Sequence, residues 1–360
     1  MAEEEIIPES GEIKLTQFSR GAGCGCKIAP AQLEQILRSD VVQAHFPQLL
    51  VGNGNNDDAA VYDIGEGRAI ISTTDFFMPV VDDAFTFGQI AAANALSDVF
   101  AMGGKPFMAV AILGWPVDKL PLELAGKVLD GARAACADVN IPLAGGHSID
   151  STEPIFGLAV TGLVNTTDLK KNNTAKEGDL VYLTKKIGTG ILSTAQKRGL
   201  LDEQYLAAMT GQMTSINKIG ALLAKEEVTA MTDVTGFGLL GHLIEMAEGA
   251  DLSAEIYYDR LPVMDGAREY LSQRIVPDAT YRNWNSYSAN TSFDKGVNVM
   301  EAFNLLPDPQ TNGGILFTCP ASAQGSVEKL LTAEGLMEFA KPIGRMVTAT
   351  EKRVRVMKEA

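Results

Sequence analysis

The sequence predicts an α+β fold made of two α/β domains. The chain has 360 residues, enough for two domains of roughly 150 residues each. Apolar residues make up 46% of the chain, so a full globular core can be buried. Strand-like and helix-like segments mix along the chain without strict βαβ alternation, which favours mixed sheets packed with helices.

The first half carries three helix signals and four strand signals. Residues 1–20 are polar and expected to be frayed, and a short helix is expected over 31–37. The capping-box spacing of Thr86 and Gln89 begins a helix that should end before Gly103. A second helix, over 120–139, is amphipathic. Apolar runs predict strands over 59–64, 68–74, 107–113 and 155–164.

A polar stretch over 165–178 is the best candidate for a linker between the two domains. We therefore expect an N-terminal segment over 1–48, a first domain over 49–166 and a second domain over 167–360. Within the second domain the sequence predicts strands over 179–184 and 314–318, helices over 191–197 and 215–225, and a strand-loop-helix unit over 230–247.

Composition excludes several classes of function. The formal net charge is −15, which repels a nucleic-acid backbone, although divalent cations can still bridge carboxylates to a small anion such as ATP. No apolar run approaches the roughly 20 residues that span a bilayer, and the acidic N-terminus differs from a signal peptide, so a cytoplasmic protein is expected. Four cysteines make no disulfide framework, and Cys136 and Cys319 are predicted core residues.

Residues 21–27 combine alternate glycines with two thiols and a lysine. Glycine adopts backbone angles closed to other residues, so this segment is predicted to be a mobile loop that exposes Cys24 and Cys26. The charge of Lys27 should lower the pKa of a neighbouring thiol and raise its thiolate fraction. We expect chemistry here.

Carboxylates and amides recur at the ends of predicted strands and on one helix. Asn55, Asn56, Asp57 and Asp58 precede a strand, where they form either a polar turn or a ligand site, and Asp75 closes the next strand. Asn94 and Asp98 share one helix face. Asp98 also opposes the dipole at the C-terminus of that helix, which a bound cation would offset, unless it is a solvated surface aspartate.

Two glycine-rich segments complete the candidate site. Gly146, His147 and Ser148 form either a backbone contact to phosphate or a structural turn. Asp233 precedes a glycine-rich turn that opens a helix, although the segment is neither a P-loop nor a dinucleotide fingerprint. Asp58, Asp98 and Asp233 are hard oxygen ligands of the kind that suits Mg²⁺ with ATP. Residues 308–314 are predicted to be a turn without assigned chemistry.

These motifs, in this order, resemble the selenophosphate synthetase (selenide, water dikinase) family, within the aminoimidazole ribonucleotide synthetase-like superfamily. The similarity runs from about Leu15 to Gly314, and the Cys-Gly-Cys-Lys loop is its most specific part. The resemblance implies that selenide, ATP and water are converted to selenophosphate, phosphate and AMP. It also implies a homodimer, Mg²⁺, and K⁺ as a further cation.

The resemblance implies a role for each matching residue. Cys24 matches the catalytic cysteine and Lys27 the essential lysine, while Arg20 stands where a histidine is common in bacterial members. The magnesium ligands implied are Asp58, Asp98 and Asp233. The ATP contacts implied are Lys27, Asn55, Asn56, Asp57, Asp75 and Asp98, with Gly146, His147 and Ser148 supplied by the dimer partner.

Two other functions remain open at this point. A related ATP-dependent kinase with another acceptor, such as a thiamine-phosphate kinase, would keep the aspartates without needing Cys24 and Cys26. A thiol redox or metal-carrier protein would use the two cysteines as ligands, but one residue of spacing supplies only two of the four that a closed zinc site takes.

Overall fold

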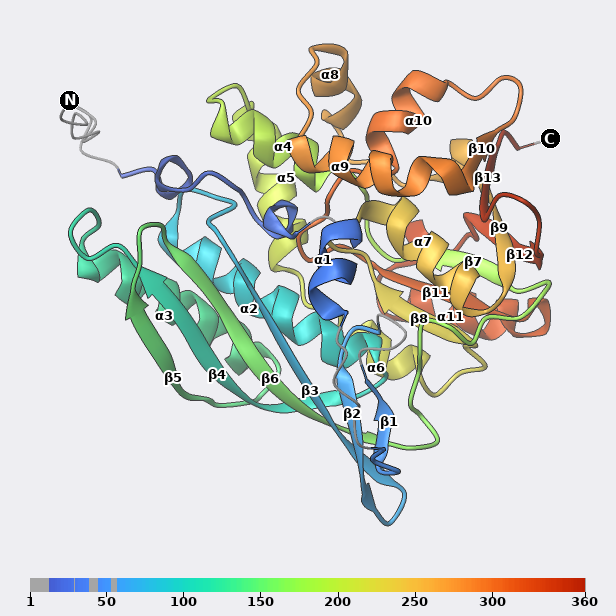
Figure 1. Ribbon diagram of the computed structural model, residues 1–360, viewed down its shortest axis with the longest axis horizontal. Coiled ribbons are helices and arrows are strands. Elements are labelled where there is room, and N and C mark those ends of the chain that lie inside the picture. Colours follow the sequence, from blue (N-terminus) through green and yellow to red (C-terminus); the bar gives the residue numbers. More distant parts are fainter. Residues whose placement is uncertain (1–12, 29, 39–44, 53–56, 360) are drawn as a thin grey trace.

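The computed structural model describes residues 13–28, 30–38, 45–52 and 57–359. Two mixed sheets, each covered by helices, make up its core (Figure 1). The predicted α+β architecture is confirmed. No helix in the described ranges is long and apolar enough to cross a membrane.

The first sheet has six strands in the order β1-β2-β3-β6-β4-β5. Its pairs are antiparallel except for β4 and β5, which run parallel. Helices α2 and α3 pack on each other and against this sheet (Figure 1). The elements are β1 (Leu49–Val51), β2 (Ala60–Gly65), β3 (Arg68–Phe77), α2 (Ala84–Ala101), β4 (Lys105–Trp115), α3 (Leu122–Asp138), β5 (Leu143–Asp150) and β6 (Ile155–Asn165).

The second sheet has seven strands in the order β10-β13-β9-β12-β7-β11-β8. Its strands are β7 (Leu180–Leu183), β8 (Ala230–Asp233), β9 (Leu252–Tyr257), β10 (Thr291–Phe293), β11 (Ile315–Cys319), β12 (Gly344–Thr348) and β13 (Val354–Met357). Its helices are α4 (Thr189–Lys197), α5 (Glu203–Thr214), α6 (Ile219–Leu223), α7 (Gly238–Gly249), α8 (Ala267–Ser272), α9 (Asp278–Tyr287), α10 (Val299–Leu305) and α11 (Gln324–Ala333).

Helix α2 joins the two halves. It packs against β3 and β6 of the first sheet and also against α5, α6 and β8 of the second half. Fifteen of its eighteen residues are buried, including the polar Asn94, Ser97 and Asp98. A helix that is buried on nearly all sides can present polar groups to a site between the halves.

Several local expectations need correction. Asp83, rather than Thr86, caps α2: its side chain accepts a hydrogen bond from the Thr86 N–H at 2.7 Å. Residues 15–18 form a short 3₁₀ helix with Leu15 fully buried, so residues 13–20 are packed rather than frayed. The helix expected over 215–225 is only Ile219–Leu223, and α5 carried no recognised signal.

The segments that position the candidate site come from both halves. The 3₁₀ turn Cys24–Cys26 follows Gly23, whose N–H bonds to the carbonyl of Met78 just after β3. Helix α1 (Pro30–Leu37) continues the chain beyond this turn. Residues 308–314 form a buried connection between α10 and β11. The first sheet uses strands between residues 49 and 165 and the second uses strands from 180 onward, but the domain limits themselves stay a prediction.

Candidate active site

Cys24 lies between the two halves of the molecule. Its backbone N–H donates a hydrogen bond to Thr311 Oγ1 at 3.1 Å, and its thiol donates to Asn94 Oδ1 at 3.3 Å. The residue is 1% exposed, whereas Cys26 is half-buried. The expectation of an exposed Cys24 thiol is therefore wrong for this conformation.

Gly23 allows the turn to come this close. Its φ is +51°, a left-handed angle that costs other residues energy. A Cβ placed on it would lie 2.3 Å from Thr311 Oγ1 and 3.0 Å from a methyl of Val80. Glycine is thus required here both by the backbone angle and by the contact with residues 308–314.

The buried position changes the acidity of the thiols. Burial, and secondly the charge of Asp75, raise the pKa of Cys24 well above that of a free cysteine, although Lys27 acts in the opposite direction. Burial also raises the pKa of Cys26. The predicted lowering of the thiol pKa is wrong for this conformation, because desolvation of the thiolate outweighs the nearby cation.

Asn94 connects the thiol to the carboxylates. Its Oδ1 accepts from the Cys24 thiol and from the N–H of Asn312 at 2.7 Å, while its Nδ2 donates to Asp75 Oδ2 at 2.6 Å. The backbone donor of Asn312 identifies the oxygen of this amide, since only the oxygen can accept. One side chain of α2 therefore joins the 24–26 turn, the end of β3 and the connection before β11.

Lys27 lies on the same side of the turn as Asp75. Its Nζ is 3.9 Å from Asp75 Oδ2, 3.5 Å from Thr235 Oγ1 and 6.0 Å from the centre of the Phe237 ring. Burial acts to lower the pKa of Lys27, but Asp75, Cys24 and nearby carboxylates raise it above the ordinary lysine value. The ammonium group is therefore charged at neutral pH and faces the carboxylates.

Asp58, Asp98 and Asp233 form an acidic cluster in which Asp98 and Asp233 are buried and Asp58 is half-buried. Burial and mutual repulsion raise the pKa of Asp58 and of Asp98 well above the usual range, and burial raises that of Asp233 to about 6. Asp98 is 8% exposed, so it is not a solvated surface aspartate. The Thr73 hydroxyl donates a hydrogen bond to Asp98, and the Thr232 hydroxyl donates one to Asp58 at 2.7 Å.

This cluster fits a divalent cation bound together with phosphates. Asp58 Oδ2 and both oxygens of Asp233 are buried and accept no hydrogen bond of ordinary geometry, although Ser97 is close enough to lower the pKa of Asp233. Within the described ranges, no three His, Cys, Asp or Glu side chains alone are arranged to hold a metal ion. Mg²⁺ usually takes one or two carboxylates and completes its shell with phosphate and water, which suits this arrangement.

The other predicted residues are Asn55, Asn56 and Asp57 and, elsewhere in the fold, Gly146, His147 and Ser148. Asn55 and Asn56 lie outside the described residues. Asp57 accepts from the N–H of Asn172 at 2.8 Å, and burial raises its pKa. Asp57 Oδ2 is buried without a partner, so this carboxylate also has unused acceptor capacity.

Gly146, His147 and Ser148 are not brought to the cluster. They lie on β5, the exposed edge strand of the first sheet, and not in a turn or a glycine loop (Figure 1). Strand β5 pairs in parallel with β4, and a Cβ on Gly146 would lie 2.2 Å from the carbonyl oxygen of Ala111. The close approach of β4 and β5 therefore requires a glycine at position 146 even without any contact to phosphate.

Two groups of residues escaped the sequence reasoning. Thr311 and Asn312, in the segment without assigned chemistry, hold the Cys24 turn and Asn94. His242, on α7, accepts from the N–H of Thr235 at 3.1 Å through Nε2, and so supports the hydroxyl that contacts Lys27. Burial lowers the pKa of His242 to about 3, so its ring is neutral. The sequence signal for this contact was the position of His242 seven residues after Thr235, across a strand-to-helix turn.

Comparisons with known proteins agree with this architecture. Family models described as "AIR synthase related protein", N-terminal and C-terminal domain, match residues 56–164 and 176–357. The structure of thiamine-monophosphate kinase from Stenotrophomonas maltophilia K279a aligns with a TM-score of 0.63 and 20% identity, covering 90% of this chain and 93% of that one. Hydrogenase maturation protein HypE in complex with ATP aligns with a TM-score of 0.62 and 18% identity, over 87% and 86% of the two chains. The chain thus has the AIR synthase-related fold.

Closer relatives define the family within that class. The selenide, water dikinase of Sulfurovum sp. (strain NBC37-1) is 50% identical over 346 residues, which cover 96% of this chain and 99% of the relative. That of Colwellia psychrerythraea (strain 34H / ATCC BAA-681) is 51% identical with the same coverage. The chain belongs to the selenide, water dikinase family, and the family predicted from the sequence motifs is confirmed.

Proposed function

We propose that this chain is an ATP-dependent selenide, water dikinase in which Cys24 and Lys27 act on selenium and phosphate. Selenide, ATP and water give selenophosphate, phosphate and AMP. The observation that carries the proposal is the contact chain from the Cys24 thiol through Asn94 to Asp75 and Lys27, beside the acidic cluster. A soft nucleophile and a phosphate-binding cation are thereby kept within one site.

Asp58, Asp98 and Asp233 would hold Mg²⁺, whose charge offsets that of the phosphates when it is bound. Their unused buried oxygens support this role. Lys27 would face the phosphates, and Asn55, Asn56, Asp57 and Asp75 would contact ATP, as the family resemblance implies. Phosphoryl transfer depends on positioning and on electrostatic stabilisation, which these side chains supply. K⁺ as a further cation remains an expectation from the family.

The turn at Cys24 would have to move during the reaction. Its glycines permit a change of backbone angles, and the buried thiol must be released from Asn94 before it can meet selenide. In a closed state the loop would exclude bulk water, so that hydrolysis affects only the phosphoryl group that is to be released as phosphate. Cys26 would have an assisting role.

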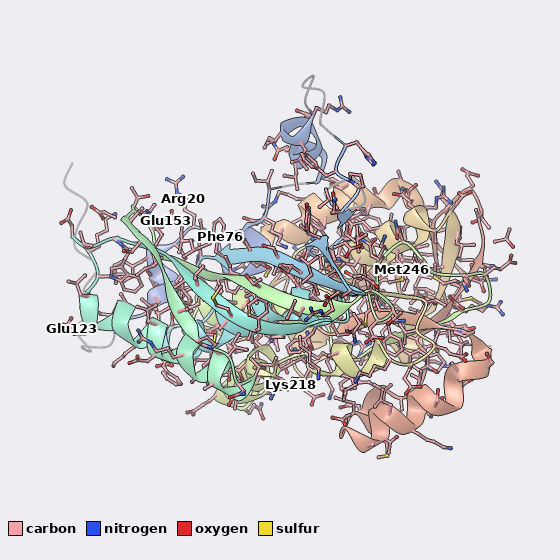
Figure 2. All side chains as sticks on the ribbon, turned by 90° about the horizontal axis from the view of Figure 1, so that it is seen from below. Arg20, Phe76, Glu123, Glu153, Lys218 and Met246 are labelled. Carbon is pink, nitrogen blue, oxygen red and sulfur yellow. The ribbon has the colours of Figure 1, made fainter. Side chains whose placement is uncertain are left out.

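A homodimer is the assembly that we propose, with Gly146, His147 and Ser148 contributed to the partner's ATP. Phe77 points towards α2 and contacts Phe87, so its neighbour Phe76 points to the uncovered face of the sheet (Figure 2). Phe76 is 48% exposed, and other large apolar side chains are also exposed on this sheet. A sheet face of this kind favours burial against another protein surface. We also propose a cytoplasmic location.

The structural likeness to thiamine-monophosphate kinase leaves a second function to weigh. At 20% identity it reports the fold alone. Cys24 and Cys26 favour selenide, because phosphorylation of an alcohol or phosphate acceptor has no use for a thiol beside the carboxylates. A thiol redox or metal carrier would not require the acidic cluster.

Product analysis tests the proposal. The protein is incubated anaerobically with ATP, Mg²⁺ and selenide, and nucleotides are separated by chromatography. We expect AMP that depends on selenide, and its loss in Cys24→Ser with nucleotide binding retained. Cys26→Ser is the matched control and should lose less activity. Formation of ADP instead of AMP, or full activity of Cys24→Ser, would overturn the proposal.

A further inference from the structure

A second pocket lies against the outside of the Cys24 turn. It has a volume of about 420 Å³ and is formed by the turn together with α4, α9 and the connection before β11. Gly21, Ala22 and Gly25 line it, and so does Thr311, whose hydroxyl holds the Cys24 N–H. None of Asp58, Asp75, Asp98 or Asp233 belongs to its lining, so it is separate from the carboxylate site.

The pocket is cationic in a strongly acidic protein. Its charged lining residues are Arg20, Lys197, Arg198 and Arg282, against the single carboxylate of Asp278. The whole chain has a formal charge of −15, so an excess of positive charge here is a local exception. A cleft lined by one sign of charge concentrates small ions of the opposite sign and raises their rate of arrival.

Lys197 and Arg282 also bind the backbone on either side of Cys24, which forms one wall of the pocket. Lys197 Nζ donates to the carbonyl oxygens of Ser19 at 2.6 Å, Arg20 at 3.1 Å and Gly21 at 3.0 Å. Arg282 Nη2 donates to the carbonyl oxygen of Gly25 at 2.8 Å. The backbone on both sides of Cys24 is thus attached to the walls of the pocket.

The other two cations are exposed: Arg20 forms an ion pair with Glu153, which leaves Arg198 to meet a solute. The Arg20 side chain is 98% exposed and projects beside Glu153 at the edge of the molecule (Figure 2). Arg198 is exposed after the end of α4, and its guanidinium forms no hydrogen bond or ion pair with the described residues. Ser193 and Thr194 add hydroxyl groups to the lining.

We propose that this pocket binds the selenium substrate as a small monoanion and delivers it to Cys24 from the side opposite ATP. Hydrogen selenide is a monoanion at neutral pH, and ATP is also negatively charged. Because the two substrates repel each other, separate routes to the site would favour their binding together. Because Cys24 is almost fully buried, a reactant reaches its thiol only by a specific path. The pocket ends at the backbone of the turn while the thiol faces Asn94, so the turn must open for a solute in the pocket to reach the thiol. This assignment rests on the proposed function.

Steady-state kinetics test the route. Arg198→Glu is compared with Arg133→Glu, a charge reversal far from the pocket on the exposed surface of α3, where Arg133 pairs with Asp130 at 2.7 Å. We expect Arg198→Glu to raise the KM for selenide by about three- to tenfold, the effect of reversing an exposed charge beside an anion, with kcat and the KM for ATP unchanged. Arg133→Glu should match the wild type. An unchanged KM for selenide, or an equal rise in the KM for ATP, would overturn the assignment.

Inorganic phosphate is a second small anion that the same charges would attract. If Arg198→Glu weakens product inhibition by phosphate but leaves the KM for selenide unchanged, the pocket belongs to phosphate and the assignment to selenide is wrong.

Alkylation provides a readout that does not require turnover. Iodoacetate is an anion and iodoacetamide is neutral, so the ratio of their rates at Cys24 reports the charge along the path, independently of the thiol pKa. Mass spectrometry of the peptide should give a higher ratio than free glutathione, and Arg198→Glu should lower it at least threefold. An unchanged ratio, or a Cys24 that neither reagent reaches, would overturn the route even in an active enzyme. Failure of the wild type to form AMP would instead refute the proposed function.

Discussion

Replacing Asp233 by asparagine should stabilise the ligand-free protein while weakening its binding of magnesium and ATP. Asp233 is 1% exposed, and neither carboxylate oxygen accepts a hydrogen bond of ordinary geometry. Burial, reinforced by Asp75, raises its pKa to about 6 despite Ser97, Lys27 and Lys185. The charged carboxylate is therefore a cost to folding, which protonation or a bound cation removes.

The size of that cost follows from the shift in pKa. A rise from 3.8 to about 6 corresponds to about 3 kcal/mol at neutral pH, since each unit is worth about 1.36 kcal/mol. The pKa of Asp233 is higher in the folded state, so the cost is fully present above about pH 6 and disappears as the pH falls towards 3.8. Asparagine carries no charge, and the variant should unfold about 5 °C above the wild type at pH 7.5.

Thermal unfolding in a chelating buffer measures this effect, at pH 7.5 and again at pH 5, where the advantage of Asp233→Asn should shrink. Asp179→Asn is the matched control, because Asp179 is equally buried but its Oδ2 accepts from the N–H of Lys176 at 2.8 Å and from Thr229. We expect this control to lower the melting temperature. Adding Mg²⁺ and ATP should stabilise the wild type more than Asp233→Asn. A less stable Asp233→Asn at pH 7.5 without ligand would refute the reasoning.

Three further substitutions test other parts of the site. Asp98→Asn should weaken binding of Mg-ATP at least tenfold by calorimetry, and unchanged affinity would remove Asp98 from the metal site. Gly23→Ala should abolish activity, because its Cβ would meet Thr311 Oγ1 at 2.3 Å, whereas Gly211→Ala has open space and should be silent. His242→Leu leaves the buried Thr235 N–H without an acceptor and should cost about 1–3 kcal/mol of unfolding free energy in denaturant titrations; a stability equal to the wild type would show that this hydrogen bond does not matter.

The elements that the sequence predicted well are those specified by local patterns. The apolar runs near 68–74 and 155–164 became the central strands β3 and β6, and the amphipathic segment near 120–139 became α3. Gly103 does end α2, with a φ of +78°. In each case the period of apolar residues or a single glycine decides the structure without help from distant residues.

The predictions that were wrong have a common cause, namely contacts between residues far apart in the sequence. Gly145 and Gly146 have the composition of a turn, yet pairing with β4 makes them part of an edge strand. The local glycine pattern around Cys24 indicates an exposed loop, but Thr311, 287 residues away, and Asn94, 70 residues away, bury the thiol. No local pattern reports such partners, and the three aspartates were found only because each stands at the end of an element.

The hydrogen bonds of Asn94 define the protonation state of this conformation. Its Oδ1 is held towards Cys24 by the N–H of Asn312 and by its own Nδ2 bond to Asp75. A thiol can donate to that oxygen, whereas a thiolate would meet a lone pair and be repelled. Burial and Asp75 raise the pKa of Cys24 in the same direction. The observed turn thus favours the neutral thiol, and separation from Asn94 would favour ionisation of Cys24.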